Sequence, residues 1–195
     1  MYDTLKALNA KRFANVHTTR FYNNSQYMEE HKANYIGALA RLNLPPSLWP
    51  VVACIHLREA DLDWNTQLAQ GDPLDRVSIH VPRGQGPYFG PDAWSRAAAR
   101  ALADEGIQMW GDWTPGGYTT FWERYNGLGY ASMGRPSPYV WAGTNQYVSG
   151  KYIADGEYSS SAIDSQPGCV EVLLWLAQKD PLINIHDLSV GNAGV

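Results

Sequence analysis

The architecture of this chain is governed by SLWPVVACIHLRE, residues 47–59. Nearly every position from 48 to 57 is apolar, so a helix formed here would be apolar around its whole circumference and would have to be buried. Ser47 is a preferred N-cap residue, and Pro50 is tolerated in a first helical turn. We therefore expect a buried helix that begins at Ser47 and ends where the sequence turns polar, around Glu59.

Glu59 has the most unusual expected environment in this helix. The negative end of the helix dipole disfavours a carboxylate, and partial burial would disfavour it further, so both effects favour the neutral carboxyl that a general acid needs. Arg58 and His56 act in the opposite direction if they lie close. The alternative interpretation is a solvated glutamate that pairs with Arg58 or Arg41.

Length and composition limit what kind of protein this can be. The 195 residues are 45% apolar and 17% charged, with a formal net charge of −4. We expect one domain, residues 1–195, with a core large enough to form without disulfides. The low charge excludes charge-driven disorder, and 15 basic against 19 acidic residues argue against a nucleic-acid binder.

The aromatic residues are biased toward rings with a polar atom. There are 8 Trp and 12 Tyr against only 4 Phe. Buried Tyr and Trp need hydrogen-bond partners, so a core alone would favour Phe. This bias is typical of a wet, sugar-binding cleft.

The rest of the chain is expected to be mostly helical. An N-terminal segment over 1–44 should be helical and pack on the domain, and further helices are predicted over 93–105, 118–125 and 161–178. Alternation in Val77–Val81 predicts a short strand. Residues 131–160 read as a long aromatic loop, a feature that is usually functional, and 179–195 as an extended or loosely docked tail.

Several signals are missing from the sequence. It has no secretory signal at its start and no run of 18 apolar residues, so we expect synthesis in the cytoplasm and no membrane insertion. No metal-ligand set or cofactor motif is readable, so we expect neither. Cys54 and Cys169 are expected as buried free thiols, with a disulfide as the alternative.

Short motifs follow one another in a fixed order between residues 45 and 176. They are HLRE at 56–59, GDPL at 71–74, HVP at 80–82, FWERYNGLGY at 121–130, and the stretch 137–156 with SPYVWAGTN and GKYIADG. The first resembles the catalytic helix end of goose-type lysozymes and lytic transglycosylases, although Ala60 replaces the usual Ser. The fourth resembles the Tyr-Asn motif that lines the sugar cleft in that group. The whole pattern resembles phage and bacterial endolysins of the lysozyme-like superfamily.

The resemblance implies a mainly α, lysozyme-like α+β fold. It would have a buried catalytic helix, a helical lobe and a small β-hairpin or loop lobe flanking a glycan cleft. The implied activity is that of a muramidase, which cleaves the β-1,4 bond between N-acetylmuramic acid and N-acetylglucosamine. Glu59 would protonate the leaving oxygen. The partner would be peptidoglycan glycan strands, acted on by a monomer without a cofactor.

The second catalytic group is left open by the sequence. Asp72 lies where some lysozymes place their second carboxylate, but it also reads as a plain turn residue before Pro73. Asp155 and Glu123 are further candidates. Goose-type enzymes and transglycosylases can manage with one Glu.

Aromatic and amide side chains near the later motifs are expected to contact the sugar, because pyranose C–H faces stack on rings and amides bond N-acetyl groups. The predicted substrate contacts are Tyr125, Asn126, Tyr130, Trp141, Tyr147, Tyr152 and Asp155. The tryptophans in helical or apolar contexts are expected in the core: Trp49, Trp64, Trp94, Trp122 and Trp175.

Other functions remain open at this point. A lytic transglycosylase would use the muramic acid C6 hydroxyl instead of water and leave 1,6-anhydro ends. A non-catalytic glycan-binding virion protein could share the same fold, whereas a zinc amidase lacks a readable ligand set. An enzyme of the cell wall without a signal peptide needs a holin, delivery in a virion or another export route, and the sequence does not choose among them.

Overall fold

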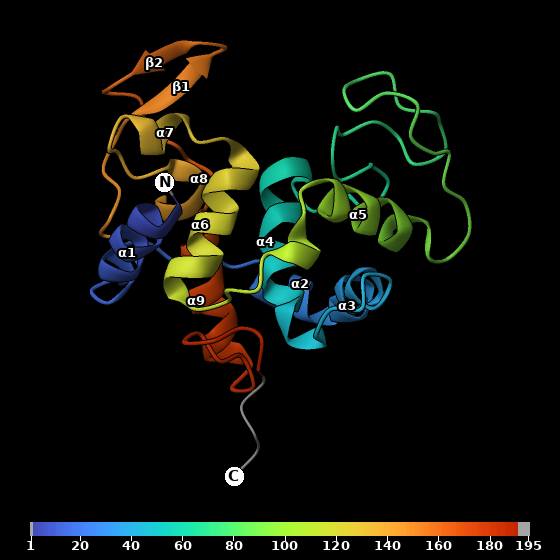
Figure 1. Ribbon diagram of the computed structural model, residues 1–195, viewed down its shortest axis with the longest axis horizontal. Helices are drawn as coiled ribbons and strands as arrows, with labels where there is room; N and C mark the ends of the chain where they lie inside the picture. Colours follow the sequence, from blue (N-terminus) through green and yellow to red (C-terminus); the bar gives the residue numbers. More distant parts are fainter. Residues whose placement is uncertain (1, 191–195) are drawn as a thin grey trace. The chain divides into compact units, whose positions relative to one another are not determined.

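The computed structural model describes residues 2–190 of the chain (Figure 1). The expected fold class is confirmed: these residues are mainly helical and include a small antiparallel hairpin. No helix within this range combines the length and the apolar character needed to cross a membrane.

The chain forms two compact units. The inserted unit is the continuous segment Tyr27–Gly111, and the discontinuous unit comprises Met1–Gln26 and Asp112–Val195. The expected N-terminal segment 1–44 is therefore divided between the two, with a non-helical stretch over 14–24.

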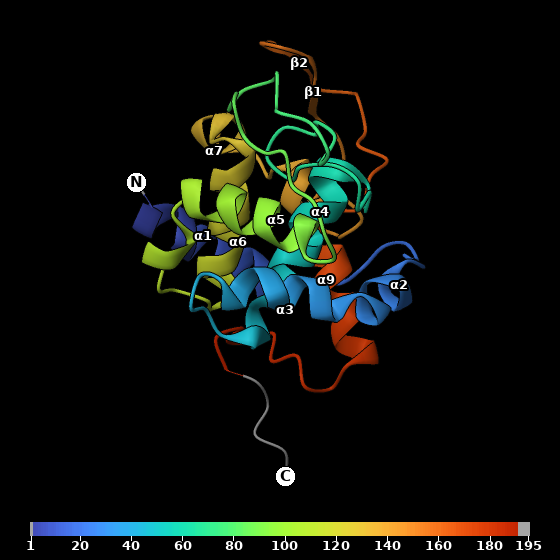
Figure 2. The ribbon, with the colours of Figure 1, turned by 90° about the vertical axis from the view of Figure 1, so that its right-hand side faces the viewer.

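The inserted unit is built around the segment that dominates the sequence. Its elements are α2 (Ser25–Glu30, which begins two residues before the unit), α3 (Lys32–Ala40), η1 (Pro46–Leu48), α4 (Trp49–Ala60), α5 (Ala93–Asp104) and η2 (Ile107–Met109). Helix α3 packs against both α4 and α5 (Figures 1 and 2). Every residue of α4 from Trp49 to Leu57 is buried, which confirms the predicted buried helix.

The start of α4 differs from the prediction. Ser47 lies inside the 3-10 turn η1 and makes no capping hydrogen bond to α4. Pro46 begins that turn, and Pro50 occupies the first turn of α4. The fixed φ of the two prolines suits both first turns, so the chain enters α4 through the 3-10 turn rather than through a serine cap.

The discontinuous unit contains the other helices and the hairpin. Its elements are α1 (Tyr2–Phe13), α6 (Pro115–Asn126), α7 (Gly129–Ser132), α8 (Pro138–Trp141), β1 (Lys151–Ala154), β2 (Glu157–Ser159) and α9 (Cys169–Lys179). Helix α6 packs against α1, α8 and α9. A Cβ on Gly116 would lie 2.5 Å from the Lys6 carbonyl oxygen, so the close approach of α1 and α6 requires glycine there.

Three local predictions are wrong. Val77–Val81 forms no strand, because the N–H groups of Ile79 and His80 donate to the Asp72 carboxylate instead of a neighbouring strand. Strands form instead within 131–160, which also contains α8 and the end of α7 and is therefore no structureless loop. The last helix begins at Cys169 rather than 161, after Pro167 and Gly168.

The structure also bears on the predictions for the C-terminal tail and the two cysteines. Residues 180–190 are docked rather than loose: Leu188 is buried and donates its N–H to the Trp113 carbonyl oxygen. The last five residues, 191–195, lie outside the described part of the chain. Cys54 and Cys169 are both buried and free, as expected.

Candidate functional site

Glu59 is an exposed carboxylate on the last turn of a buried helix. Helix α4 ends one residue later, and Asp61 and Leu62 both adopt left-handed backbone conformations, with φ of 48° and 63°. Such residues turn the chain sharply away from the helix axis. The predicted partial burial of Glu59 is wrong, because its side chain is exposed. The residue therefore offers a reachable carboxyl group on a firmly held backbone.

His56, one turn before Glu59, anchors this end of α4. Its Nε2 lies 3.2 Å from the Asp63 carbonyl oxygen, and its Nδ1 lies 3.3 Å from the Tyr35 hydroxyl. A carbonyl only accepts, so Nε2 carries the proton and Nδ1 accepts from Tyr35. Burial among the rings of Trp64 and Trp94 lowers the pKa of His56 to about 4. The imidazole is therefore neutral at neutral pH.

The depressed pKa of His56 predicts a loss of stability in acid. In the unfolded chain the pKa is about 6.5, so the unfolded state binds the proton first as the pH falls. Above pH 6.5 neither state binds this proton, and the stability is unaffected. As the pH falls from 6.5 toward 4, the free energy of unfolding decreases by about 3 kcal/mol, because only the unfolded state takes up the proton. Urea unfolding of wild type and His56→Gln at pH 7 and pH 4 measures it. Equal pH dependence in the two proteins would contradict the prediction.

Asp72 serves as an anchor of the loop that follows α4. Its Oδ2 accepts the backbone N–H groups of Ile79 and His80, each at 3.0 Å, and its Oδ1 lies 2.8 Å from His80 Nδ1. The backbone N–H of His80 is the main reason that the pKa of Asp72 lies below its usual range. Both oxygens of this buried carboxylate are engaged, which matches the turn-residue interpretation rather than that of a second catalytic group.

Glu123 is also poorly placed to act as a second catalytic group. It lies in α6 of the discontinuous unit and is buried, with Oε1 3.4 Å from Trp141 Nε1 and 3.9 Å from Arg12 Nη1. Burial raises the pKa of its carboxyl group. A carboxyl enclosed in this way is out of reach of a polymeric substrate.

Three of the predicted sugar contacts are buried. Trp141 is 0% exposed, and its indole N–H points to Glu123. The Tyr147 hydroxyl donates to the Gly150 carbonyl oxygen at 3.3 Å, and the Tyr130 hydroxyl accepts the N–H of Tyr152 at 3.0 Å. Their polar atoms form hydrogen bonds with other residues of the discontinuous unit. The enclosed Trp141 ring has no exposed face on which a sugar could stack.

The other predicted contacts remain accessible. Asn126 ends α6 and is exposed, Tyr125 beside it is half-buried, and Asp155 is exposed in the turn of the hairpin. Tyr152 on β1 is 36% exposed. Its ring meets that of Tyr130 edge-on at 5.2 Å.

The hairpin places a third tyrosine ring beside those of Tyr130 and Tyr152. Tyr158 on β2 is the register partner of Tyr152. Its ring lies 5.6 Å from that of Tyr152 and 6.4 Å from that of Tyr130. The tyrosine cluster, defined as Tyr130, Tyr152 and Tyr158, is thus an edge-to-face group at the hairpin. The sequence did not single out Tyr158, because cross-strand pairing was not predicted there.

A cavity in the inserted unit was also missed. It has a volume of about 510 Å³ and lies among α3, the loop after α4 and the start of α5. Its lining includes Trp64 and Trp94, both expected in the core, together with Tyr88 and Phe89. The signal that could have found it is the pair Tyr88-Phe89 in a Gly- and Pro-rich loop, since such backbone permits close approach of a ligand.

No metal centre is formed in the described range: within residues 2–190 no three His, Cys, Asp or Glu side chains come together that could hold an ion. Comparison of the chain with protein families, with curated proteins and with solved structures yields no match. The chemistry of the residues themselves is therefore what supports an assignment of function.

Proposed function

We propose that this protein is a peptidoglycan glycosidase of the muramidase type, with Glu59 as the general acid. The observation that carries the proposal is the exposed carboxyl group of Glu59 on the last turn of a helix whose preceding residues, from Trp49 to Leu57, are all buried. Burial of the helix fixes the backbone, and exposure lets the carboxyl reach a polymer. The motif order of the sequence supports the same assignment.

The proposed reaction transfers one proton from Glu59 and breaks one glycosidic bond. The protonated carboxyl of Glu59 donates its proton to the glycosidic oxygen as the C1–O bond breaks, and the sugar develops oxocarbenium character. Water then adds to C1 and loses a proton, which restores the carboxyl group.

One observation favours the transglycosylase as a second candidate. Both oxygens of Asp72 are engaged by Ile79 and His80, so Asp72 is poorly placed to activate a water molecule. The muramic acid C6 hydroxyl could attack C1 in place of water, because an intramolecular nucleophile needs less activation. The Glu59 step is the same in both reactions.

Product analysis tests the proposal and separates the two candidates. Purified sacculi are digested with the full chain, and the soluble products are analysed by mass spectrometry. New reducing ends on muramic acid indicate hydrolysis, and 1,6-anhydro ends indicate a transglycosylase. Intact sacculi after prolonged digestion would refute glycosidase activity of either kind.

A further inference from the structure

The loop between α4 and α5 exposes several apolar side chains. Val77, Ile79 and Val81 are 52%, 69% and 79% exposed, and Phe89 is 63% exposed. Residues 76–89 are called the apolar loop from here on. A single exposed apolar residue is normal on a protein surface, but a group of them in one segment indicates a site of interaction. The apolar loop is therefore a candidate docking surface.

Hydrogen bonds hold the backbone of the apolar loop in place. Ser78 is only 3% exposed, although the residues on either side of it are exposed. Its N–H donates to the Gln85 carbonyl oxygen, and its hydroxyl donates to the Pro82 carbonyl oxygen, both at 2.8 Å. The Asp72 carboxylate accepts the N–H of Ile79 at 3.0 Å. The apolar side chains are thus displayed by a braced segment and not by a loose one.

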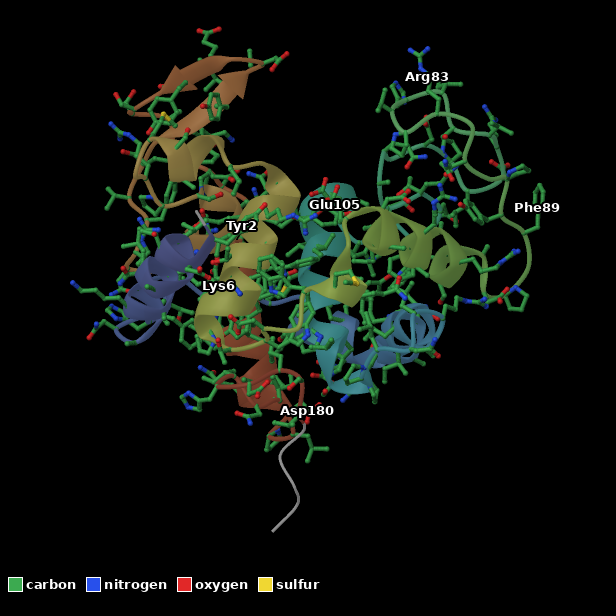
Figure 3. The ribbon with its side chains drawn as sticks, viewed as in Figure 1. Tyr2, Lys6, Arg83, Phe89, Glu105 and Asp180 are labelled. Carbon is green, nitrogen blue, oxygen red and sulfur yellow. The ribbon has the colours of Figure 1, made fainter. Side chains whose placement is uncertain are left out.

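The apolar loop carries positive charge. It contains two arginines and one histidine but no Asp or Glu, whereas the whole chain has a formal net charge of −4. Arg76 Nε lies 3.8 Å from Asp75 Oδ1, and His80 Nδ1 lies 2.8 Å from Asp72 Oδ1. Arg83 is exposed and forms no ion pair within the described part of the chain. Figure 3 shows Arg83 at the tip of the loop, pointing away from the helices of the inserted unit. The uncompensated charge on this surface is therefore positive.

Lipid headgroups match both properties of the apolar loop. A guanidinium group binds phosphate oxygens through two parallel hydrogen bonds. The layer beneath the headgroups accepts aliphatic and aromatic side chains. Side chains as exposed as those of Ile79 and Val81 need a partner that closes around them, and a fluid acyl layer does so without a preformed groove. An anionic phospholipid offers phosphate and hydrocarbon in one surface, and its negative charge complements Arg83.

We propose that the apolar loop docks on the surface of an anionic phospholipid membrane. Ile79, Val81 and Phe89 would enter the boundary between headgroups and acyl chains, and Arg83 would pair with a lipid phosphate. The contact is peripheral and reversible, because a few side chains bury less apolar area than one myristoyl chain, which alone binds only marginally. It involves no step of the chemistry at Glu59.

Vesicle flotation with the full-length protein tests the proposal. Vesicles of phosphatidylcholine and phosphatidylglycerol in equal parts are titrated into the protein, and the floated fraction is measured. We expect wild type to float with the vesicles. The double variant Ile79→Ser with Val81→Ser should bind about tenfold more weakly, as loss of about two buried methylene groups predicts. Arg83→Gln should bind about fivefold more weakly, which is the contribution of one arginine near an anionic surface.

Val148→Ser is the matched control. Val148 is 82% exposed, close to the 79% of Val81, but it lies in the discontinuous unit. Its variant should bind the vesicles as wild type does. All of the substituted side chains are exposed, so each variant should fold, which urea unfolding checks.

A fluorescent label shows which residue meets the membrane. Cys54 and Cys169 are both 0% exposed, so a maleimide label attaches selectively to a new exposed thiol. An environment-sensitive nitrobenzoxadiazole group is attached to Val81→Cys and, separately, to Val148→Cys. On vesicles the emission of the first protein should shift to the blue, and that of the second should stay unchanged.

Three outcomes would overturn the proposal. They are wild type that does not float with the vesicles, full binding in both the double variant and Arg83→Gln, or emission from Val81→Cys that the vesicles leave unchanged. A loop that binds only a soluble protein gives the first outcome. Glu59→Gln should float as wild type does. Flotation without digestion of sacculi, or digestion without flotation, then tells which of the two proposals has failed.

Discussion

Glu59→Gln is expected to lower muralytic activity about a thousandfold while the protein remains folded. The amide keeps the size and polarity of the side chain but cannot donate the proton to the glycosidic oxygen, and general acid catalysis contributes roughly 10²–10⁴-fold. The side chain is exposed, so the stability should change by no more than about 0.5 kcal/mol. Turbidity loss of purified sacculi and denaturant unfolding measure the two quantities.

The matched control for this variant is Glu105→Gln. Glu105 is the C-cap residue of α5, so it too places a carboxylate at the C-terminal end of a helix of the inserted unit (Figure 3). It should retain full activity. If Glu59→Gln keeps most of its activity, or if both variants lose it equally, Glu59 is not the acid.

Arg20→Met is expected to lower the free energy of unfolding by about 1–3 kcal/mol, the usual cost of leaving a buried acceptor unsatisfied, because the Glu171 carboxylate is enclosed while the Arg20 side chain is 36% exposed. The Arg20 Nε lies 3.1 and 3.0 Å from the two oxygens of Glu171, which is 0% exposed. The same guanidinium donates to the carbonyl oxygens of Ser165 and Gln166. Its loss leaves a buried carboxylate and two carbonyl groups without these donors.

The surroundings of Glu171 leave it little room to adjust. A Cβ on Gly143 would lie 1.7 Å from Glu171 Oε2, so Gly143, with φ of +79°, is packed directly on the carboxylate. Burial raises the pKa of Glu171 while Arg20 opposes the shift. Without Arg20 the pKa rises further, and the folded variant takes up a proton more readily in acid. The deficit of Arg20→Met should therefore be smaller at pH 4 than at pH 7.

Urea unfolding of Arg20→Met is compared with that of Arg100→Met. Arg100 pairs with Asp104 on the exposed surface of α5, where such pairs contribute only about 0.3–0.5 kcal/mol. A loss in Arg20→Met as small as that in Arg100→Met would show that the Arg20–Glu171 pair contributes little to folding.

The parts of the fold that were predictable follow from strong local patterns. The run from Trp49 to Leu57 is apolar around a whole helix, so burial was the one way to remove it from water, and α4 is buried as predicted. Gly106 supplies the left-handed residue directly after the end of α5, close to the predicted limit. These features need no knowledge of distant residues.

The wrong predictions depend on partners that lie outside the predicted segment itself. The alternation in Val77–Val81 suits a strand, but a strand needs a neighbour, and Asp72 accepts the N–H groups that would have paired with one. Trp141 was predicted as a sugar contact because it lies in one of the later motifs and its ring could stack on a pyranose face. In the fold that ring is fully buried, and its indole nitrogen points to Glu123, 18 residues earlier in the chain.

The candidate site also combines features that the local sequence determines with features that depend on packing. The position of Glu59 at the polar end of a buried helix could be read from residues 47–59, because a hydrophobic run and its end are local properties. The exposure of Glu59 and the engagement of Asp72 could not. Whether a polar atom is covered, paired or exposed depends on which other segments pack against it, and only the folded chain determines that.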